Sequence, residues 1–351
     1  MIYDLCKKTI GFRVRKDMYE MSFIPDYYKH RVAVVAYSNY FKNYSDSFTE
    51  CIKEYGIETE AFSHIKDALL YNPTCVVVIG PTMFHKPPRN KKILWVMLQT
   101  EQLFGRICSN QPFYKKNVYR LKPYLNRYDL ILDSSQDNIV GLKKITKTDI
   151  LHFPDGWYGE QDSDFKCCNI NKEYDLIFVG DNTGVMGRRW KILEYLKTRY
   201  KVYPKSTGLW DDEKIKAIQS SKIALNLHYD ESRYMESARI RDYLSAKCFV
   251  LSEPIDDPFP LKLGVDYDEF FLTNICEKID YYLQNDEKRE RMAEHAFKAI
   301  RSYTLYDSMK IFVDWLIMKS YSNYLNNLTL GYKIKQYFKI RKESKNRLIN
   351  D

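Results

Sequence analysis

Short runs of apolar residues alternate along the first half of the chain with segments of helical periodicity. Polar residues or glycine bound each apolar run, which predicts buried strands. We expect strands at residues 32–37, 57–62, 75–80, 93–98 and 129–132, a last strand from residue 150, and helices at 45–55, 64–71 and 136–144. Strands and helices that alternate at this spacing indicate parallel βα units.

The same alternation returns in the second half after a polar stretch at residues 159–173. We expect strands at residues 175–179, 201–203, 223–229 and 248–251, and helices at 189–196, 213–220, 235–244, 274–283 and 287–303. Three prolines make residues 254–263 irregular. Residues 305–328 carry an apolar stripe at helical spacing, which predicts one more amphipathic helix.

At 351 residues the chain is long for a single core and suits two α/β domains. The predicted division is an N-terminal extension at 1–29, a first domain at 30–158, a linker at 159–173, a second domain at 174–304, a last helix at 305–330 and a basic tail at 331–351.

The most informative stretch, residues 221–253, is predicted to form a strand, a helix and a second strand. A unit of this length is a parallel crossover, and open parallel sheets bind ligands beyond the carboxyl ends of their strands. Glu236, Arg239 and Asp242 recur every third residue on the helix. They either face such a ligand or form a solvated row of ion pairs.

The pattern Arg239-x-x-Asp242-(x)3-Ala246-x-Cys248-x-Val250-x-Ser252-Glu253 resembles the nucleotide-sugar subdomain of GT-B glycosyltransferases. The resemblance is greatest to the spore-maturation-protein-like and family 1-like members. It implies that Arg239 contacts the donor diphosphate and that Asp242 binds the ribose hydroxyls. This chain departs from the family in two places, because the family more often has glutamate at Asp242 and glycine at Lys247.

The resemblance also implies the fold, which is α/β with two Rossmann-like domains facing across a cleft and a C-terminal helix that crosses back to the first domain. A glycine-bearing loop at residues 180–187 precedes a predicted helix, whose positive N-terminus favours phosphate. Its glycine spacing is not that of the dinucleotide fingerprint. The donor-site candidates are Gly180, Arg188, Arg189, His228, Glu236, Arg239, Asp242, Ser252 and Glu253.

Residues 93–98 are predicted to deliver Glu101 to the carboxyl end of the first sheet. Related GT-B enzymes, including a phage DNA glucosyltransferase, place an acidic residue there that takes the proton of the acceptor hydroxyl. Glu101 is therefore the candidate general base, and partial burial would raise its pKa toward neutrality. Alternatively, Glu101 caps the next element or pairs with Arg106.

Composition narrows the class of protein. A hydrophobic content of 45% with 30 tyrosines argues against disorder. Eight cysteines without a C-x-x-C spacing favour a reduced, cytoplasmic protein, and we expect neither a signal peptide nor a membrane-spanning segment. No convincing D-x-D pair is present, so we expect a metal-independent reaction without a cofactor beyond the nucleotide sugar.

The net charge of +9 is concentrated at the C-terminus, where residues 331–351 hold seven Lys or Arg against two acids. Such a tail attracts anionic membrane or nucleic acid, although it is more often a solvated chain end. If the tail binds anionic membrane, the protein would associate peripherally with the inner face of the membrane.

The sequence thus predicts transfer of a sugar from a nucleotide-diphosphate sugar to an acceptor hydroxyl, with a surface polysaccharide or glycolipid as the acceptor. A nucleotide-sugar-binding module without catalysis is the first alternative, because Asp242 and Lys247 depart from the family. A nucleic-acid-modifying glucosyltransferase is the second. Basic and aromatic residues of this chain do not interleave outside the tail, which disfavours binding to nucleic acid.

Overall fold

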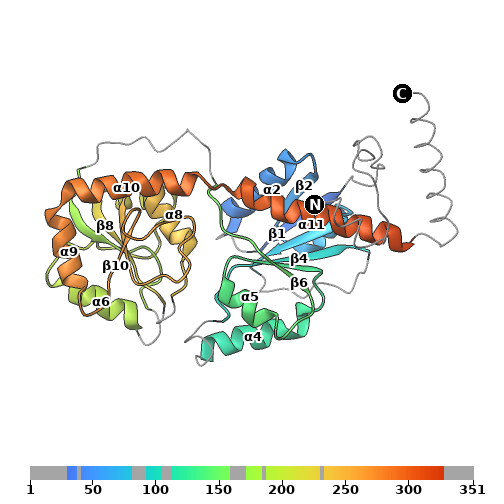
Figure 1. Ribbon diagram of the computed structural model, residues 1–351, viewed down its shortest axis with the longest axis horizontal. Helices are drawn as coiled ribbons and strands as arrows, with labels where there is room; N and C mark the ends of the chain where they lie inside the picture. The colour runs from blue at the N-terminus through green and yellow to red at the C-terminus, as the bar shows by residue number, and fades with distance from the viewer. Residues whose placement is uncertain are drawn as a thin grey trace, which may run out of the picture.

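A computed structural model describes residues 30–37, 41–80, 92–104, 112–158, 171–183, 187–229 and 233–327. These residues build two parallel sheets, one within residues 31–152 and one within 174–269. Figure 1 shows the two sheets in separate lobes, with helices around each. The α/β class predicted from the sequence is confirmed.

The first sheet has six strands in the order β2-β1-β3-β4-β5-β6. Its strands are β1 (Arg31–Ala36), β2 (Glu58–Phe62), β3 (Cys75–Ile79), β4 (Leu94–Gln99), β5 (Leu130–Asp133) and β6 (Asp149–His152), and all neighbours pair in parallel. Along β1, Val32 and Val34 enter one core while Ala33 and Val35 enter another. The central strands β3 and β4 are apolar up to Gln99, the last residue of β4, because both faces of the sheet are buried.

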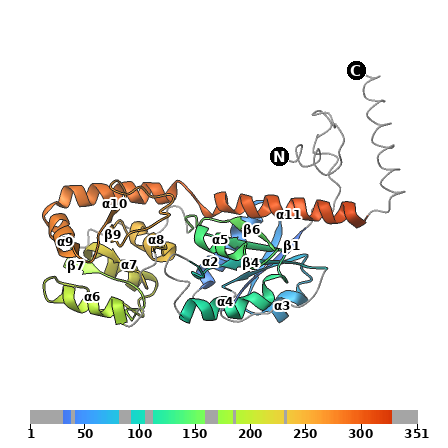
Figure 2. The same cartoon turned by 60° about the horizontal axis from the view of Figure 1, so that its bottom comes forward.

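Helices cover both faces of this sheet: α2 (Lys42–Glu54), α3 (Ile65–Leu70), α4 (Pro112–Leu125) and α5 (Gln136–Leu142). In Figure 2, α3 and α4 lie on the side of the sheet opposite α11 (Leu305–Asn327). The helix α4 was absent from the sequence prediction. Pro112 stands at its first position, where proline is tolerated, but Pro123 lies inside the helix and argues against a helix in the sequence.

The second sheet has four parallel strands in the order β10-β9-β8-β7. They are β7 (Tyr174–Ile177), β8 (Ser221–Asn226), β9 (Phe249–Ser252) and β10 (Asp268–Glu269). The strand predicted at residues 201–203 is wrong in extent, because it is reduced to one bridge between Val202 and Leu176. Pro204 follows directly and has no N–H to continue the ladder at this edge.

Five helices within the described ranges pack on the second sheet: α6 (Arg188–Lys197), α7 (Asp211–Gln219), α8 (Ser237–Ser245), α9 (Ile275–Gln284) and α10 (Asp286–Arg301). One face of the sheet packs with α7 and α8, and the other with α6 and α9. Ile177, Ala224 and Val250 from three neighbouring strands share the first core. The strand–helix–strand unit predicted at residues 221–253 is confirmed.

The chain leaves the second lobe after α10 and continues into α11, which lies along the first lobe (Figure 1). Met309, Phe312 and Leu316 of α11 are buried in the core that contains Val32 and Val34 of the first sheet. The C-terminal helix is therefore an integral part of the first domain's core.

The two chain segments that join the lobes run side by side. Trp157 N donates to Tyr303 O at 2.9 Å, and Leu305 N donates to Trp157 O at 2.7 Å. A Cβ atom at Gly156 would lie 2.1 Å from the carbonyl carbon of Thr304. A residue without a side chain is thus required where the segments touch.

Several predictions lie outside the described residues, namely the N-terminal extension at 1–29, most of the linker at 159–173 and the basic tail at 331–351. None of the helices within the described ranges has a stretch that is both long enough and apolar enough to cross a membrane.

Candidate functional site

Arg239 of α8 reaches back to the carboxyl ends of β7 and β8. Its Nε donates to Val179 O at 2.7 Å, and its Nη1 donates to Asn226 Oδ1 at 3.1 Å and to Leu227 O at 3.2 Å. The guanidinium also lies over the ring of Phe178. With 8% of its side chain exposed, Arg239 is held at the edge of the sheet rather than on a solvated helix face.

Gly180 is the residue that lets Arg239 lie there. It directly follows Val179 and adopts a φ of +136°, which L side chains rarely adopt. A Cβ atom at this position would lie 2.9 Å from Arg239 Nη2. The loop glycine noted in the sequence therefore accommodates an arginine, while residues 184–186 of the same loop lie outside the described part.

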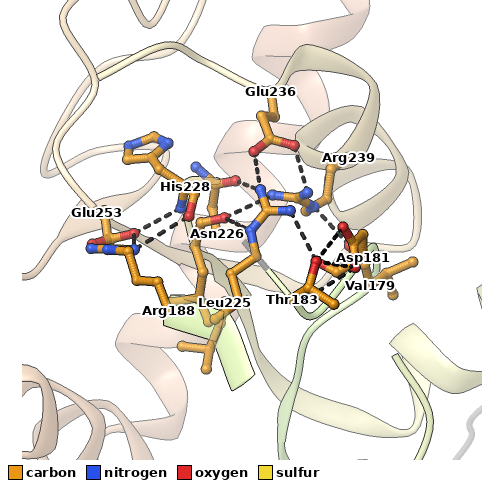
Figure 3. Close-up of polar contacts among 12 residues, drawn as sticks. Val179, Asp181, Thr183, Arg188, Leu225, Asn226, His228, Glu236, Arg239 and Glu253 are labelled. Atoms are coloured by element: carbon orange, nitrogen blue, oxygen red, sulfur yellow. Dashed lines mark hydrogen bonds and ion pairs between the residues drawn. The ribbon is translucent and has the colours of Figure 1, made fainter. Parts of the chain in front are cut away.

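Arg189 lies beside Arg239, and Glu236 bridges the two guanidinium groups. Figure 3 shows the contact between Glu236 and Arg239. Arg189 Nε donates to Leu227 O and Nη1 to Asp181 O, each at 2.9 Å. Its Nη2 pairs with Glu236 Oε1, and Arg239 Nη2 pairs with Glu236 Oε2 at 2.5 Å. Glu236 precedes α8 as its N-cap residue, so the helix begins two residues later than the predicted 235.

Asp181 shows the electrostatic effect of the two arginines. Burial alone would raise the pKa of its carboxyl group, but hydrogen bonds from Thr183 and the charges of Arg189 and Arg239 lower it. The carboxylate accepts from Thr183 N at 2.9 Å. This end of the second sheet is therefore a site of positive potential that favours the ionised form of an acid.

A second ion pair, between Arg188 and Glu253, adjoins this cluster. The guanidinium and carboxylate meet through two contacts, one of them 2.9 Å long. Glu253 also accepts from His228 N at 2.7 Å, and His228 Nε2 lies 3.0 Å from Pro254 O. Ser252 is buried and accepts a hydrogen bond from Asn226 Nδ2 at 2.9 Å. These four candidates form a buried support next to the two-arginine cluster.

Asp242 pairs with α7 instead of with the arginines, because its Oδ2 lies 2.7 Å from Lys214 Nζ. About a third of its side chain is exposed, at 34%. The row of Glu236, Arg239 and Asp242 is thus divided, since the first two meet at the sheet edge and the third pairs elsewhere.

Lys247, which stands where GT-B sequences of the kind that this chain resembles more often have glycine, has a φ of +50°. Cys248 N donates to Tyr243 O and Lys247 N donates to Leu244 O, each at 3.0 Å. This is the hydrogen-bond pattern of a Schellman motif, whose left-handed residue is usually glycine. Lys247 adopts this left-handed conformation, and its Nζ forms an ion pair with Glu294 at 2.8 Å.

Glu101 follows β4 at the carboxyl end of the first sheet, as predicted. Burial raises the pKa of its carboxyl group, and the negative charge of Glu236 raises it further. The loop is held by Asn138, whose Nδ2 donates to Glu101 O at 2.9 Å and whose Oδ1 accepts from Leu103 N at 2.7 Å. Arg106, the alternative partner of Glu101, lies outside the described residues.

Asp133, at the end of β5, supports Asn138 in turn. Its Oδ1 accepts from Ser135 N at 2.8 Å and from Asn138 Nδ2 at 3.3 Å. Its Oδ2 is buried without a partner among the described residues. Burial raises the pKa of Asp133 well above its usual range, and the charge of Asp155 adds to this effect.

Asp155 joins the two domains next to these residues, a role that the sequence did not reveal. Its carboxylate accepts from Tyr44 in the first domain at 3.3 Å and from Ser237 at the start of α8. Arg241 of α8 also donates to Tyr158 OH at 2.5 Å and lies over that ring. The sequence favoured a turn-forming role for Asp155 over one in the cleft, and its partners lie more than 80 residues away along the chain.

Comparisons with known proteins agree with the geometry of the second domain. Residues 171–310 match the protein family described as glycosyl transferase-like. No sequence among the curated proteins matches the chain. Within the described ranges, no three His, Cys, Asp or Glu side chains gather as metal ligands.

Solved structures extend the similarity to both domains. Sucrose-phosphate synthase from Thermosynechococcus elongatus matches with a TM-score of 0.56 and 9% identity, covering 84% of this chain and 100% of that one. HepE from Anabaena, in complex with UDP and glucose, matches with a TM-score of 0.51 and 10% identity over the same shares of the two chains. The chain therefore has the GT-B fold, and its residues 171–310 form a glycosyl transferase-like domain.

Proposed function

We propose that the chain transfers a sugar from a nucleotide-diphosphate sugar to an acceptor hydroxyl. The observation that carries this proposal is the convergence of Arg189 and Arg239 at the carboxyl ends of β7 and β8, where open parallel sheets bind ligands. Guanidinium groups suit phosphate because their N–H donors lie in a fixed plane. The UDP in the HepE structure agrees with a donor of this class.

In the proposed reaction the bond between the sugar C1 and the diphosphate oxygen breaks, and a bond forms between C1 and the acceptor oxygen. Arg189 and Arg239 stabilise the negative charge that builds up on the leaving diphosphate. Glu101 accepts the proton of the acceptor hydroxyl, which its raised pKa favours. Asp242 accepts hydrogen bonds from the ribose hydroxyls, and Arg188, His228, Ser252 and Glu253 hold the surrounding backbone.

We propose that the arginines replace a divalent cation and that no cofactor beyond the nucleotide sugar is needed. The fixed positive potential at Asp181 supports this assignment. Turnover should therefore be the same within about twofold with EDTA and with added Mg²⁺. A strict dependence on a divalent ion would contradict this part of the proposal.

The proposed acceptor is a surface polysaccharide or a glycolipid. Residues 331–351, with seven basic against two acidic side chains, would bring the enzyme to anionic membrane. Sedimentation of the full chain with vesicles tests this, and we expect salt-sensitive binding to anionic vesicles and none to zwitterionic ones. Retention on DNA in place of vesicles would favour the nucleic-acid-modifying alternative.

The test of the function is a panel of nucleotide sugars that differ in base and sugar, incubated with the purified chain. We expect steady release of a nucleoside diphosphate from one donor class, faster when acceptor is present. Thermal stabilisation by a nucleotide sugar without any release would identify a binding module that lacks catalysis.

A further inference from the structure

The carboxylate of Glu236 covers the two-arginine cluster from its open side. The side chains of Arg189 and Arg239 are 3% and 8% exposed, whereas that of Glu236 is 28% exposed. Glu236 is thus the most exposed of the three side chains, and Figure 3 shows its carboxylate in contact with the guanidinium of Arg239. Burial raises the pKa of Glu101 in the first domain, and the charge of Glu236 raises it further, so this carboxylate also interacts with the first domain.

The remaining donors of both arginines are fixed by uncharged groups. Arg239 uses Nε and Nη1 for Val179 O, Asn226 Oδ1 and Leu227 O. Arg189 uses Nε and Nη1 for Leu227 O and Asp181 O. In each case the Nη2 group meets Glu236. Backbone carbonyls and the side chain of Asn226 therefore orient the two arginines, and the two Nη2 groups meet the same carboxylate.

Charge balance makes this anion replaceable. Glu236 offsets one of the two positive charges that a diphosphate would use, and the carboxylate of Asp181, which interacts with both arginines, brings the cluster close to neutral. A phosphate that approached with Glu236 in place would meet a like charge, which is unfavourable in a partly buried site. Removing the carboxylate of Glu236 without a substitute would instead leave the two buried cations only partly neutralised.

We infer that Glu236 is an internal carboxylate ligand of Arg189 and Arg239 in the ligand-free protein, and that a phosphate of the donor takes its place. The inference rests on the proposed function, because it concerns how the same arginines receive the donor. Glu236 would then compete with the nucleotide sugar, whereas a donor-binding residue would contact it directly. The carboxylate holds the two guanidinium groups in position when the site contains no nucleotide, and it competes with the nucleotide for them.

The substitution Glu236→Gln tests this inference, because it keeps the shape of the side chain and removes its charge. Calorimetric titration would use pyrophosphate and a panel of nucleoside diphosphates as probes, with the melting temperature measured alongside. We expect the variant to melt at a lower temperature than the wild type without ligand. We also expect it to bind the diphosphate at least about tenfold more tightly, with a larger ligand-induced rise in melting temperature.

The matched control is Asp286→Asn, which removes a carboxylate paired with the buried Arg289 at 2.7 Å in α10. We expect that control to leave diphosphate affinity unchanged. Equal or weaker binding by Glu236→Gln, with binding retained by the wild type, would overturn the inference and leave the proposed function standing. Absence of binding by both proteins would overturn both. Binding by the variant alone would support the inference in its strongest form.

Discussion

The guanidinium of Arg239 lies against the backbone of Gly180, so closely that a Cβ atom on that glycine would come within 2.9 Å of Nη2. The substitution Gly180→Ala should therefore displace Arg239 and strain the backbone, at a combined cost of about 1–3 kcal/mol in stability. We expect diphosphate affinity to fall at least about tenfold. Calorimetric titration and urea unfolding measure the two effects.

Gly264 provides the control for this prediction. It also has a positive φ, of +78°, but a Cβ atom there would meet nothing within 4 Å. Gly264→Ala should lose about 1–2 kcal/mol of stability from the backbone alone and keep its diphosphate affinity. Equal losses of affinity in the two variants would mean that the contact with Arg239 is irrelevant to binding.

The second prediction concerns Glu101. Glu101→Gln should lower turnover by about 10²–10⁴-fold and leave nucleotide affinity unchanged, because the glutamine cannot accept a proton. Turnover by the wild type should rise with pH through the raised pKa of Glu101. A variant that keeps full turnover would show that another group accepts the proton.

The stability of the same variant provides a further check. A carboxyl group whose folded pKa lies above its unfolded value makes the protein less stable as pH rises from the unfolded pKa to the folded one. Because burial raises the pKa of Glu101, Glu101→Gln should be more stable than the wild type at neutral pH and similar to it at pH 3. Urea unfolding at both pH values tests the sign.

Asp133 should show the largest effect of this kind, because burial raises its pKa well above the usual range. As pH rises from the unfolded pKa of Asp133 to its folded pKa, the wild-type protein should lose stability. Asp133→Asn should remove that loss, since it keeps the acceptor for Ser135 N without the titrating group. Parallel pH profiles of unfolding free energy in the two proteins would contradict a raised pKa.

Lys247 allows a test of the left-handed position after α8. Both Lys247→Gly and Lys247→Ala lose the ion pair to Glu294, but only glycine adopts a φ of +50° without strain. We expect the glycine variant to be more stable than the alanine variant by about 1 kcal/mol in thermal or urea unfolding. An alanine variant of equal stability would show that the backbone relaxes.

Local patterns were sufficient to predict most of this fold. Apolar runs located β4, which Glu101 follows, and β8, whose carboxyl end Arg239 contacts, because both strands are largely buried on both faces. The helix α4 escaped prediction because Pro123 lies within it. The strand predicted around Val202 at the sheet edge was too long. Its hydrophobicity suggested a strand, but Pro204 lacks the backbone N–H that would continue the pairing.

The partners within the site could not be predicted in the same way. Glu236 and Arg239 are three residues apart, so their proximity was visible in the sequence, but Arg189 joins them from 47 residues away. Asn138 holds the Glu101 loop across 37 residues, and Asp155 reaches Ser237 across 82. Side-chain contacts at such separations depend on how the strands are ordered in the sheet. The sequence therefore indicated which residue types face the site, and the fold determines which of them meet.

The central claim is that Arg239 binds the diphosphate of a nucleotide-sugar donor, and the titration of Arg239→Gln with nucleoside diphosphates tests it most directly. Arg289→Gln is the control, because it removes an equally buried arginine whose partners, Asp286 and Tyr282 O, lie in another part of the domain. The account predicts that both variants lose stability, that Arg289→Gln keeps wild-type affinity and that Arg239→Gln binds at least about 100-fold more weakly. Wild-type affinity in a folded Arg239→Gln variant would contradict it.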